Sequence, residues 1–274
     1  MDKRGISAVI NGDKWLILAD THVGMEFELQ GRGVRVPIQT GRMVNNIVSW
    51  AEEEGASRII ILGDVKHELP YPVESINEVK LFIENLSKSF EEVVLVAGNH
   101  DGGLEQIVDR VGLSNVKFHD SRGFMANVNG KKALLLHGNS KPSIEDFEKA
   151  EVLVMGHTHP AVVIQDEHGF VTKRPAILKI RVNKGELGKR LYGREFEDGE
   201  LSIIVLPAAN HLTIGVDVAS TLTTMFEAPR TILRYVEPWR IQDKIEVYLT
   251  DLTFLGTLDV IKRGGFERVD FDSM

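Results

Sequence analysis

The chain has 274 residues, 43% hydrophobic and 26% charged, a composition that excludes a disordered, collagen-like or membrane-bundle protein and allows a sizeable buried core. Its formal net charge of -8 argues against a protein that coats nucleic acid by charge alone. The absence of cysteine excludes disulfides, thiolate zinc sites and cysteine nucleophiles.

Five short apolar runs in the first two-thirds of the chain predict β-strands that are buried on both faces. They are Lys14–Ala19, Arg58–Leu62, Val93–Ala97, Lys132–Leu136 and Val152–Met155. Two stretches between the first three runs, Met43–Ala51 and Ile76–Phe90, have apolar residues at helical spacing. This alternation of strands and helices predicts a layered α/β fold.

Residues after about position 160 predict a second sheet with few helices. Strands are expected at Val162–Ile164, Ala176–Val182, Leu201–Leu206, Ile245–Thr250 and Thr253–Leu255. Asn183-Lys184-Gly185 is one of the predicted turns between them, and Ser220–Glu227 and Asp259–Arg263 are candidate helices. Because no linker marks a boundary, we expect a main domain over residues 1–215 and a C-terminal extension, residues 216–274, packed on it.

Residue types that bind metal ions follow each of the first five predicted strands. The segments are Asp20–His22, Gly63–His67, Gly98–Asp101, His137-Gly138 and Gly156–His159, and they contain six of the nine histidines. In layered α/β folds, ligands bind beyond the carboxyl ends of the strands. We therefore expect the five segments to form one site.

The spacing within these segments suggests which side chains act together. Residues i and i+2 of an extended segment point the same way, so Asp20 with His22, and His157 with His159, are each expected to reach one ion together. Glycines, which permit sharp turns and close backbone approach to an anion, directly precede three of the polar residues: Asp64, Asn99 and His157. The imidazole, carboxylate and amide donors suit Mn²⁺, Fe or Zn²⁺ and disfavour an all-oxygen Ca²⁺ site.

The motifs D-x-H, G-D-x-x-H, G-N-H-D, H-G and G-H-x-H, in this order over residues 20–159, resemble those of the calcineurin-like metallophosphoesterase superfamily. The resemblance implies a four-layer α/β/β/α sandwich of two mixed sheets flanked by helices. It also implies a centre of two divalent metal ions, for which we expect Mn²⁺, with Fe or Zn²⁺ as alternatives. The implied ligands are Asp20, His22 and His159 for the first ion, Asn99, His137 and His157 for the second, and Asp64 as the bridge.

Two further residues have catalytic roles by the same resemblance. His100 matches the histidine that contacts the phosphate and protonates the leaving group, a task that suits an imidazole of near-neutral pKa. Asp101 matches the residue placed to orient His100, although it could also cap the following helix.

His67, in G-D-V-K-H, resembles a histidine of the SbcD-type DNA repair nucleases that lies near the substrate phosphate; a surface or supporting role is the alternative. The segments Asp20–Pro37 and Ile204–Asn210 look like the small SbcD-related phosphoesterases, which include archaeal members and a bacterial endonuclease associated with a DNA ligase. Less than half of the chain follows His159, too little for the DNA-binding cap and partner-binding tail of the full SbcD nucleases. Processive resection of duplex ends and docking to a coiled-coil ATPase are therefore not expected.

Positive charge is concentrated in two places. Lys173–Arg194 contains eight basic residues and one acid, and three arginines follow the first motif: Arg32, Arg35 and Arg42. Both groups could touch a polyanion, and we expect substrate contacts from Arg32, Arg35, Lys173 and Arg174. The alternative is a solvated β-hairpin and solvated loop charges.

These features favour a metal-dependent hydrolase of phosphodiester bonds, with DNA as substrate, acting in DNA repair as an endonuclease or short-range exonuclease. A small-molecule phosphodiesterase or phosphatase acting on nucleotides is the alternative, and a non-catalytic interaction module is a third hypothesis. No apolar run approaches the roughly 20 residues of a membrane span, and the N-terminus does not resemble a signal peptide. We expect a cytoplasmic protein with no membrane partner, and leave a DNA-repair partner and a homodimer open.

Overall fold

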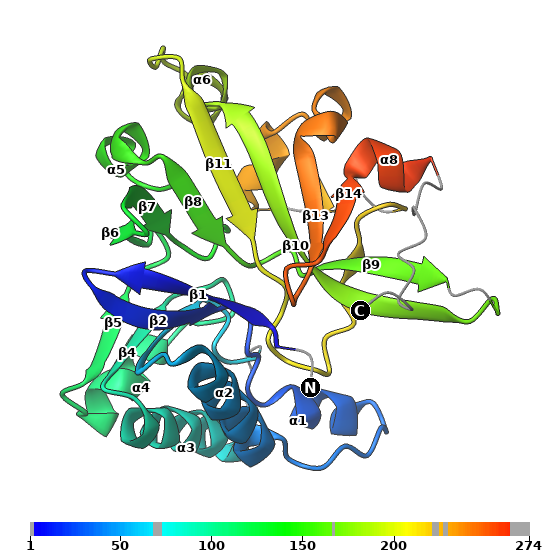
Figure 1. Cartoon of the computed structure of the whole chain (residues 1–274). Helices are drawn as coiled ribbons and strands as arrows, with labels where there is room; N and C mark the ends of the chain where they lie inside the picture. Colours follow the sequence, from blue (N-terminus) through cyan, green and yellow to red (C-terminus); the bar gives the residue numbers. More distant parts are fainter. Residues whose placement is uncertain (1–2, 68–72, 166–167, 221–224, 227–229, 264–274) are drawn as a thin grey trace.

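The computed structural model describes residues 3–67, 73–165, 168–220, 225–226 and 230–263. Its first sheet contains β1 (Gly5–Ile10), β2 (Asp13–Leu18), β3 (Arg58–Leu62), β4 (Glu92–Val96) and β5 (Val116–His119). Strands β2 to β5 are parallel neighbours, and β1 pairs antiparallel with β2. Three helices, α2 (Thr40–Glu54), α3 (Val73–Ser89) and α4 (Leu104–Val111), cover the outer face of this sheet (Figure 1).

The second sheet is larger and mixed. Its strands are β6 (Phe124–Val128), β7 (Lys131–Leu135), β8 (Val152–Met155), β9 (Pro160–Gln165), β10 (Val171–Asn183), β11 (Glu200–Val205), β12 (Val216–Asp217), β13 (Ile245–Leu249) and β14 (Phe254–Thr257). The helices on this half are α5 (Ile144–Lys149), α6 (Lys184–Tyr192), α8 (Leu258–Lys262) and the short 3-10 turns η1 (Ile232–Tyr235), η2 (Pro238–Arg240) and η3 (Gln242–Lys244). One further helix, α1 (Met25–Gly31), follows the end of β2.

Strand pairing is continuous across both sheets in the order β12-β9-β10-β11-β8-β7-β6-β1-β2-β3-β4-β5, with β13 on β10 and β14 on β13. The connection between the sheets is narrow, because β6 and β1 meet at the single pair Ile10↔Val128. The two sheets are therefore joined mainly by side-chain packing and by loops.

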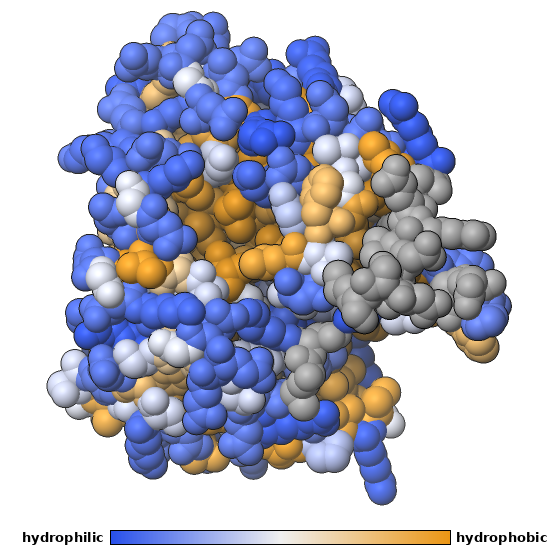
Figure 2. Space-filling model, viewed as in Figure 1, coloured by the Kyte–Doolittle hydropathy of each residue, from blue (hydrophilic) through white to orange (hydrophobic). Residues whose placement is uncertain are grey.

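Three layers of buried side chains hold the fold together. Between the sheets, Ile17 and Ile60 of the first pack in one cluster with Leu135 and Val154 of the second. Further clusters bury the outer faces of the two sheets under their helices, as with Trp50 of α2. On the face drawn in Figure 2, hydrophobic side chains gather in the gap between the sheets, left of centre. This arrangement confirms the predicted α/β/β/α sandwich.

The predicted strands and the two long helices are present, with bounds within a few residues of those expected. Sequence reasoning missed elements whose apolar pattern is short or broken: β1, β5, β6, β12, α1, α5 and α6. The predicted turn at Asn183-Lys184-Gly185 is wrong, because these residues begin α6. Asn183 caps that helix by accepting a 2.9 Å hydrogen bond from the backbone N–H of Glu186.

The hairpin reading of Lys173–Arg194 is therefore wrong over its second half, which is helical. In the predicted C-terminal extension, β13 pairs with β10, and Leu258 and Ile261 join the core of the second sheet. The candidate helix Asp259–Arg263 corresponds to α8, whereas Ser220–Glu227 lies mostly outside the described residues. None of the helices in the described part of the chain has both the length and the hydrophobicity of a membrane span.

Candidate metal centre

The ends of five strands place the predicted site residues together. The parallel strands β2, β3 and β4 lead into Asp20, Asp64 and Asn99, while β7 and β8 lead from the opposite sheet into His137 and His157. The carboxyl ends of both groups meet at the junction of the two sheets. Each sheet thus contributes part of one cluster.

Asp20, His22 and His159 form the first group that could hold a metal ion. His159 Nε2 lies 3.2 Å from Asp20 Oδ1 and 3.4 Å from His22 Nε2. Asp20 Oδ1 is buried and accepts no hydrogen bond, whereas Oδ2 accepts one of 2.9 Å from the backbone N–H of His157. Buried polar oxygens are normally paired, so this oxygen fits a divalent cation between the two imidazoles.

Asp64, His137 and His157 form the second group. His137 Nε2 lies 3.3 Å from Asp64 Oδ2, 3.1 Å from His157 Nδ1 and 3.3 Å from Asn99 Oδ1. The other ring nitrogen, His137 Nδ1, donates a 2.9 Å hydrogen bond to the Leu62 carbonyl. That bond fixes the ring so that Nε2 faces the group, an arrangement typical of metal-binding histidines.

Asp64 lies between the two groups. Its Oδ2 is 3.3 Å from His137 Nε2 in the second and 3.8 Å from His22 Nε2 in the first. Its Oδ1 accepts a 2.9 Å hydrogen bond from the backbone N–H of His100. A carboxylate in this place has the geometry of a bridging ligand.

The backbone at these residues is not extended, contrary to the prediction. Left-handed φ angles occur at five candidate ligands: Asp20 (58°), His22 (40°), Asp64 (48°), His157 (74°) and His159 (46°). Such conformations are costly for residues with side chains and cluster at functional sites. Asp20 and His22 share one group, as expected, but His157 and His159 face different groups.

Glycines let the motif loops approach one another closely, as predicted. A Cβ atom added at Gly98 would lie 2.2 Å from Asp64 Oδ1, and one at Gly156 would lie 2.4 Å from Asp20 Oδ2. At Gly63, where φ is 78°, an added Cβ would lie 2.4 Å from the ring of His137. These glycines therefore allow the backbone to approach the candidate ligands closely.

Burial and neighbouring charges set the protonation states. Burial, together with the charge of neighbouring His159, lowers the pKa of His22 to about 3. Burial, together with the charge of His137, likewise lowers the pKa of His157 to about 4. Burial also acts on His137, but the charge of Asp64 and its hydrogen bond overcome it and raise the pKa of His137 to about 9. At neutral pH, His22 and His157 are ready to bind a cation, whereas His137 must first lose a proton.

Over the residues that it describes, the structure shows neither of the contacts that the two predicted roles of Asp101 would need. Its buried carboxylate accepts hydrogen bonds from the backbone N–H groups of Val65 (3.2 Å), Lys66 (3.1 Å) and Gly98 (2.8 Å). His100 Nδ1 has no hydrogen-bond partner among the described residues, and α4 begins without a side-chain cap. Asp101 therefore joins the loops after β3 and β4 instead of orienting His100.

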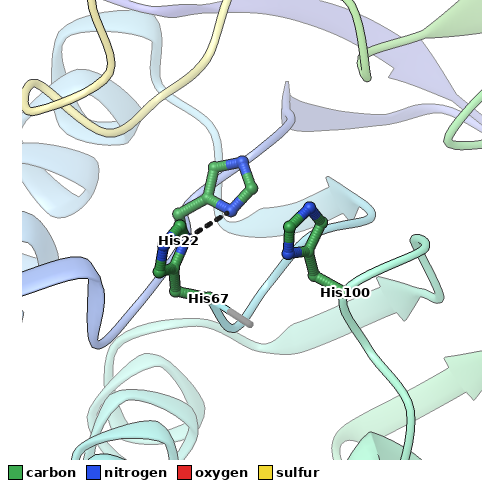
Figure 3. A group of neighbouring side chains, drawn as sticks. All are labelled: His22, His67 and His100. Carbon is green, nitrogen blue, oxygen red and sulfur yellow. Dashed lines mark hydrogen bonds between the residues drawn. The ribbon is translucent and has the colours of Figure 1, made fainter. Parts of the chain in front are cut away.

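His67 lies beside the first group, where its ring is engaged on both sides. Its Nδ1 is 3.4 Å from His22 Nδ1, as Figure 3 shows, and its Nε2 donates to the carboxylate of Glu28 on α1. His67 stacks on His100, with ring centroids 5.8 Å apart. When the His67 ring carries one proton and donates it from Nε2 to Glu28, its Nδ1 is an acceptor for His22 Nδ1–H, which leaves His22 Nε2 facing Asp20 and His159.

Three supporting residues were not assigned a role from the sequence. Glu28 binds His67, and buried Lys66 donates from its ammonium to the carbonyl of His100. Asn210 is also buried, and its side-chain amide donates to the carbonyls of Thr21 (2.9 Å) and His22 (3.1 Å). The only available signal was position: Lys66 lies inside G-D-x-x-H, Asn210 ends the segment Ile204–Asn210, and Glu28 lies within Asp20–Pro37.

The predicted substrate contacts divide by position. Lys173 lines a cavity that also contains His159, while Arg174, the next residue on β10, faces the opposite side of the strand. Arg32 pairs with Glu28 on α1, and Arg35 is exposed in the loop that follows.

Much of the remaining basic run is bound to acids. Arg181 lies 2.9 Å from Glu246, and Arg190 lies 2.9 Å from Glu237. These ion pairs neutralise part of the positive charge of the basic run Lys173–Arg194.

Comparison with known proteins gives one family match. A model of the calcineurin-like phosphoesterase superfamily domain matches residues 14–204. Among solved structures, the chain is similar to a nuclease, MPE, of Pseudomonas putida, with 16% identity, 90% of this chain and 96% of that chain covered, and a TM-score of 0.46. It is also similar to an archaeal phosphodiesterase, with 17% identity, 68% and 97% coverage, and a TM-score of 0.33. No curated protein sequence matches it.

Metal binding by the metal-free protein should tighten as the pH rises from 7 to 9. His137 is protonated below its pKa of about 9, and a cation must displace that proton. Calorimetric titration with Mn²⁺ in buffers of different ionisation enthalpy should show release of about one proton at pH 7. His137→Gln should abolish this release, and a wild-type titration without it would contradict the assignment.

Gly98→Ala should destabilise the protein and disturb Asp64. The added methyl would overlap that carboxylate, and overpacking typically costs about 1–3 kcal/mol in the free energy of unfolding. Urea denaturation measures the loss. Gly41→Ala in α2 is the matched control, because a Cβ there meets no atom within 4 Å; equal stability of the two variants would refute the close approach.

Glu28→Ala should weaken Mn²⁺ binding at the group containing His22, because Glu28 holds His67 and His67 contacts His22. Removing a direct partner of a metal-binding histidine costs about 10–100-fold in affinity, and the loss here should lie at or below the lower end of that range. Glu28→Gln retains an acceptor for His67 and should restore part of the affinity. Arg32→Ala removes the other ion-pair partner of Glu28 and is the control. If Arg32→Ala and Glu28→Ala weakened binding equally, the effect could not be assigned to the contact with His67.

Proposed function

The chain belongs to the calcineurin-like phosphoesterase superfamily, and from that premise we propose that it is a DNA nuclease that hydrolyses phosphodiester bonds at a dinuclear Mn²⁺ centre. The observation that carries the proposal is the position of Asp64 between two groups of imidazole and carboxylate donors. Two divalent cations held there would draw charge from the phosphate oxygens and favour ionisation of the attacking water.

The donor set supports the choice of ion and the division of ligands. It contains imidazole, carboxylate and amide groups and no sulfur, a combination that suits Mn²⁺. One ion would be held by Asp20, His22 and His159, the other by Asn99, His137 and His157, and both by Asp64. Asp20 Oδ1 supports this assignment, because it is buried, accepts no hydrogen bond from the described residues and lies 3.2 Å from His159 Nε2.

His100 has the position expected of a general acid. Its side chain is 23% exposed, and its Nε2 lies 3.8 Å from Asp64 Oδ2, at the edge of the two groups. Its imidazole can therefore reach both the centre and a bound substrate. Protonation of the departing alkoxide by such a group typically contributes about 10²–10⁴-fold to the rate.

DNA is favoured as substrate by two features. His67 lies in the G-D-V-K-H segment that resembles the SbcD-type nucleases, and it sits beside His22 and His100 in the structure. Arg4 and Lys173 bring positive charge to the cavity next to His159, although the chain as a whole is acidic. A polyanionic substrate matches that charge.

A substrate panel tests this function. Purified protein with Mn²⁺ should hydrolyse bis-p-nitrophenyl phosphate and cleave labelled single-stranded DNA, with duplex DNA assayed in parallel. Hydrolysis of the small diester without cleavage of any nucleic acid would replace the nuclease by a small-molecule phosphodiesterase. Absence of both bound metal and hydrolysis would favour a non-catalytic module.

In the same assays, His100→Ala should keep both metal ions but lose about 10²–10⁴-fold in kcat, since only the proton donor is removed. Elemental analysis of the variant checks the metal content. A wild-type rate in this variant would remove His100 from the mechanism.

A further inference from the structure

A cavity of about 230 Å³ opens beside His159, outside the two groups of candidate metal ligands. Its walls come from the start of β9, the adjoining part of β10, the loop after β11 and the N-terminal Arg4. Because His159 belongs both to this wall and to the first group of candidate ligands, a molecule in the cavity would border the metal centre directly.

The cavity is positively charged. None of its twelve lining residues is acidic, and two are permanent cations, Arg4 and Lys173. The Lys173 ammonium donates a 2.7 Å hydrogen bond to the Gly215 carbonyl and lies on the exposed side of β10. A second described cavity, near α6 and η2, is lined by two acidic residues, Glu186 and Glu237, as well as by basic ones. An anion is therefore better matched beside the metal centre.

The positive cavity continues onto an apolar strand face. Strands β9 and β10 form a two-stranded arm that extends away from the sandwich (Figure 1). Lys173 is paired with Val163, so their side chains lie on the same face, and Val171 lies there too, two residues along the strand. Val163 is 37% and Val171 64% exposed. This face of the arm thus presents exposed apolar side chains next to Lys173, and it begins at the cavity that His159 lines.

We propose that the cavity and this face of the arm bind the nucleotide next to the scissile phosphate on a single DNA strand. The neighbouring phosphate would lie at Lys173, and the sugar and base would contact Val163 and Val171. A bare phosphate would use only the cation, whereas a nucleotide uses both the cation and the apolar surface. An unpaired strand is required because bases in a duplex are stacked on one another.

This inference rests on the proposed nuclease function and names the part of the substrate that lies outside the metal centre. It predicts that the substrate is recognised through a flanking nucleotide. Extending a thymidine oligonucleotide from two to three residues should therefore raise kcat/KM, since the longer chain carries the second phosphate.

Lys173→Ala should remove this gain. The ratio of kcat/KM for the trinucleotide to that for bis-p-nitrophenyl phosphate should fall about tenfold, the size of one hydrogen bond to a charged group. The slope of log kcat/KM against log salt should decrease by about 0.7, as expected for one phosphate contact on a single strand. Lys131→Ala, an exposed lysine at the start of β7, is the matched control and should change neither quantity.

Val171→Asp tests the apolar face separately. A carboxylate there should repel the DNA strand and raise the KM for single-stranded oligonucleotides above that of the Lys131→Ala control. Identical length and salt dependence in wild type and Lys173→Ala would overturn the proposal. So would duplex DNA that is bound as tightly as the single strand and equally weakened by Lys173→Ala.

The failure of the nuclease function can be distinguished from the failure of this site. If the wild type hydrolyses only the small diester, fluorescence anisotropy with labelled oligothymidylate, in Ca²⁺ in place of Mn²⁺, measures binding directly. Weaker binding by Lys173→Ala than by Lys131→Ala would support the site without the activity. No difference between the two variants would remove the site as well.

Discussion

The structure depends on two carboxylates, Asp20 and Asp64, that are buried where the two sheets meet. A buried charge costs several kcal/mol unless opposite charge or hydrogen bonds compensate it. Here the compensation comes from the surrounding imidazoles and from backbone N–H groups, including that of His100 on Asp64. The left-handed turns and the close glycines bring those groups within reach. The same carboxylates raise the pKa of His137, because its protonated ring places a positive charge beside them.

The sequence was most informative where structure is decided locally. Each short apolar run predicted a strand because burial on both faces leaves a continuous pattern, and the polar residues after it predicted one site because strand ends converge. The details of that site were not predictable in the same way. Asp101 bonds to Val65 and Lys66, more than thirty residues away. His157 and His159 face different groups, and the left-handed backbone at both residues is a conformation that the apolar pattern of β8 does not reveal.

The basic run shows a second limit of sequence reasoning. Consecutive charges predict a polyanion-binding surface only if they remain together in space. In the fold, β10 carries Lys173 to the metal centre, while α6 carries Arg190 to Glu237, which is distant in sequence. The capping role of Asn183 separates the two halves. Net charge therefore describes this protein less well than the position of a few cations.

The single residue pair between β1 and β6 has a consequence for biosynthesis. Asp20, His22, Asp64 and Asn99 leave the ribosome with the first sheet, but His137, His157 and His159 come with the second. Neither half alone has a complete set of donors for either ion. A growing chain therefore presents a complete set of these donors only after His159 has emerged and the two sheets have closed on each other.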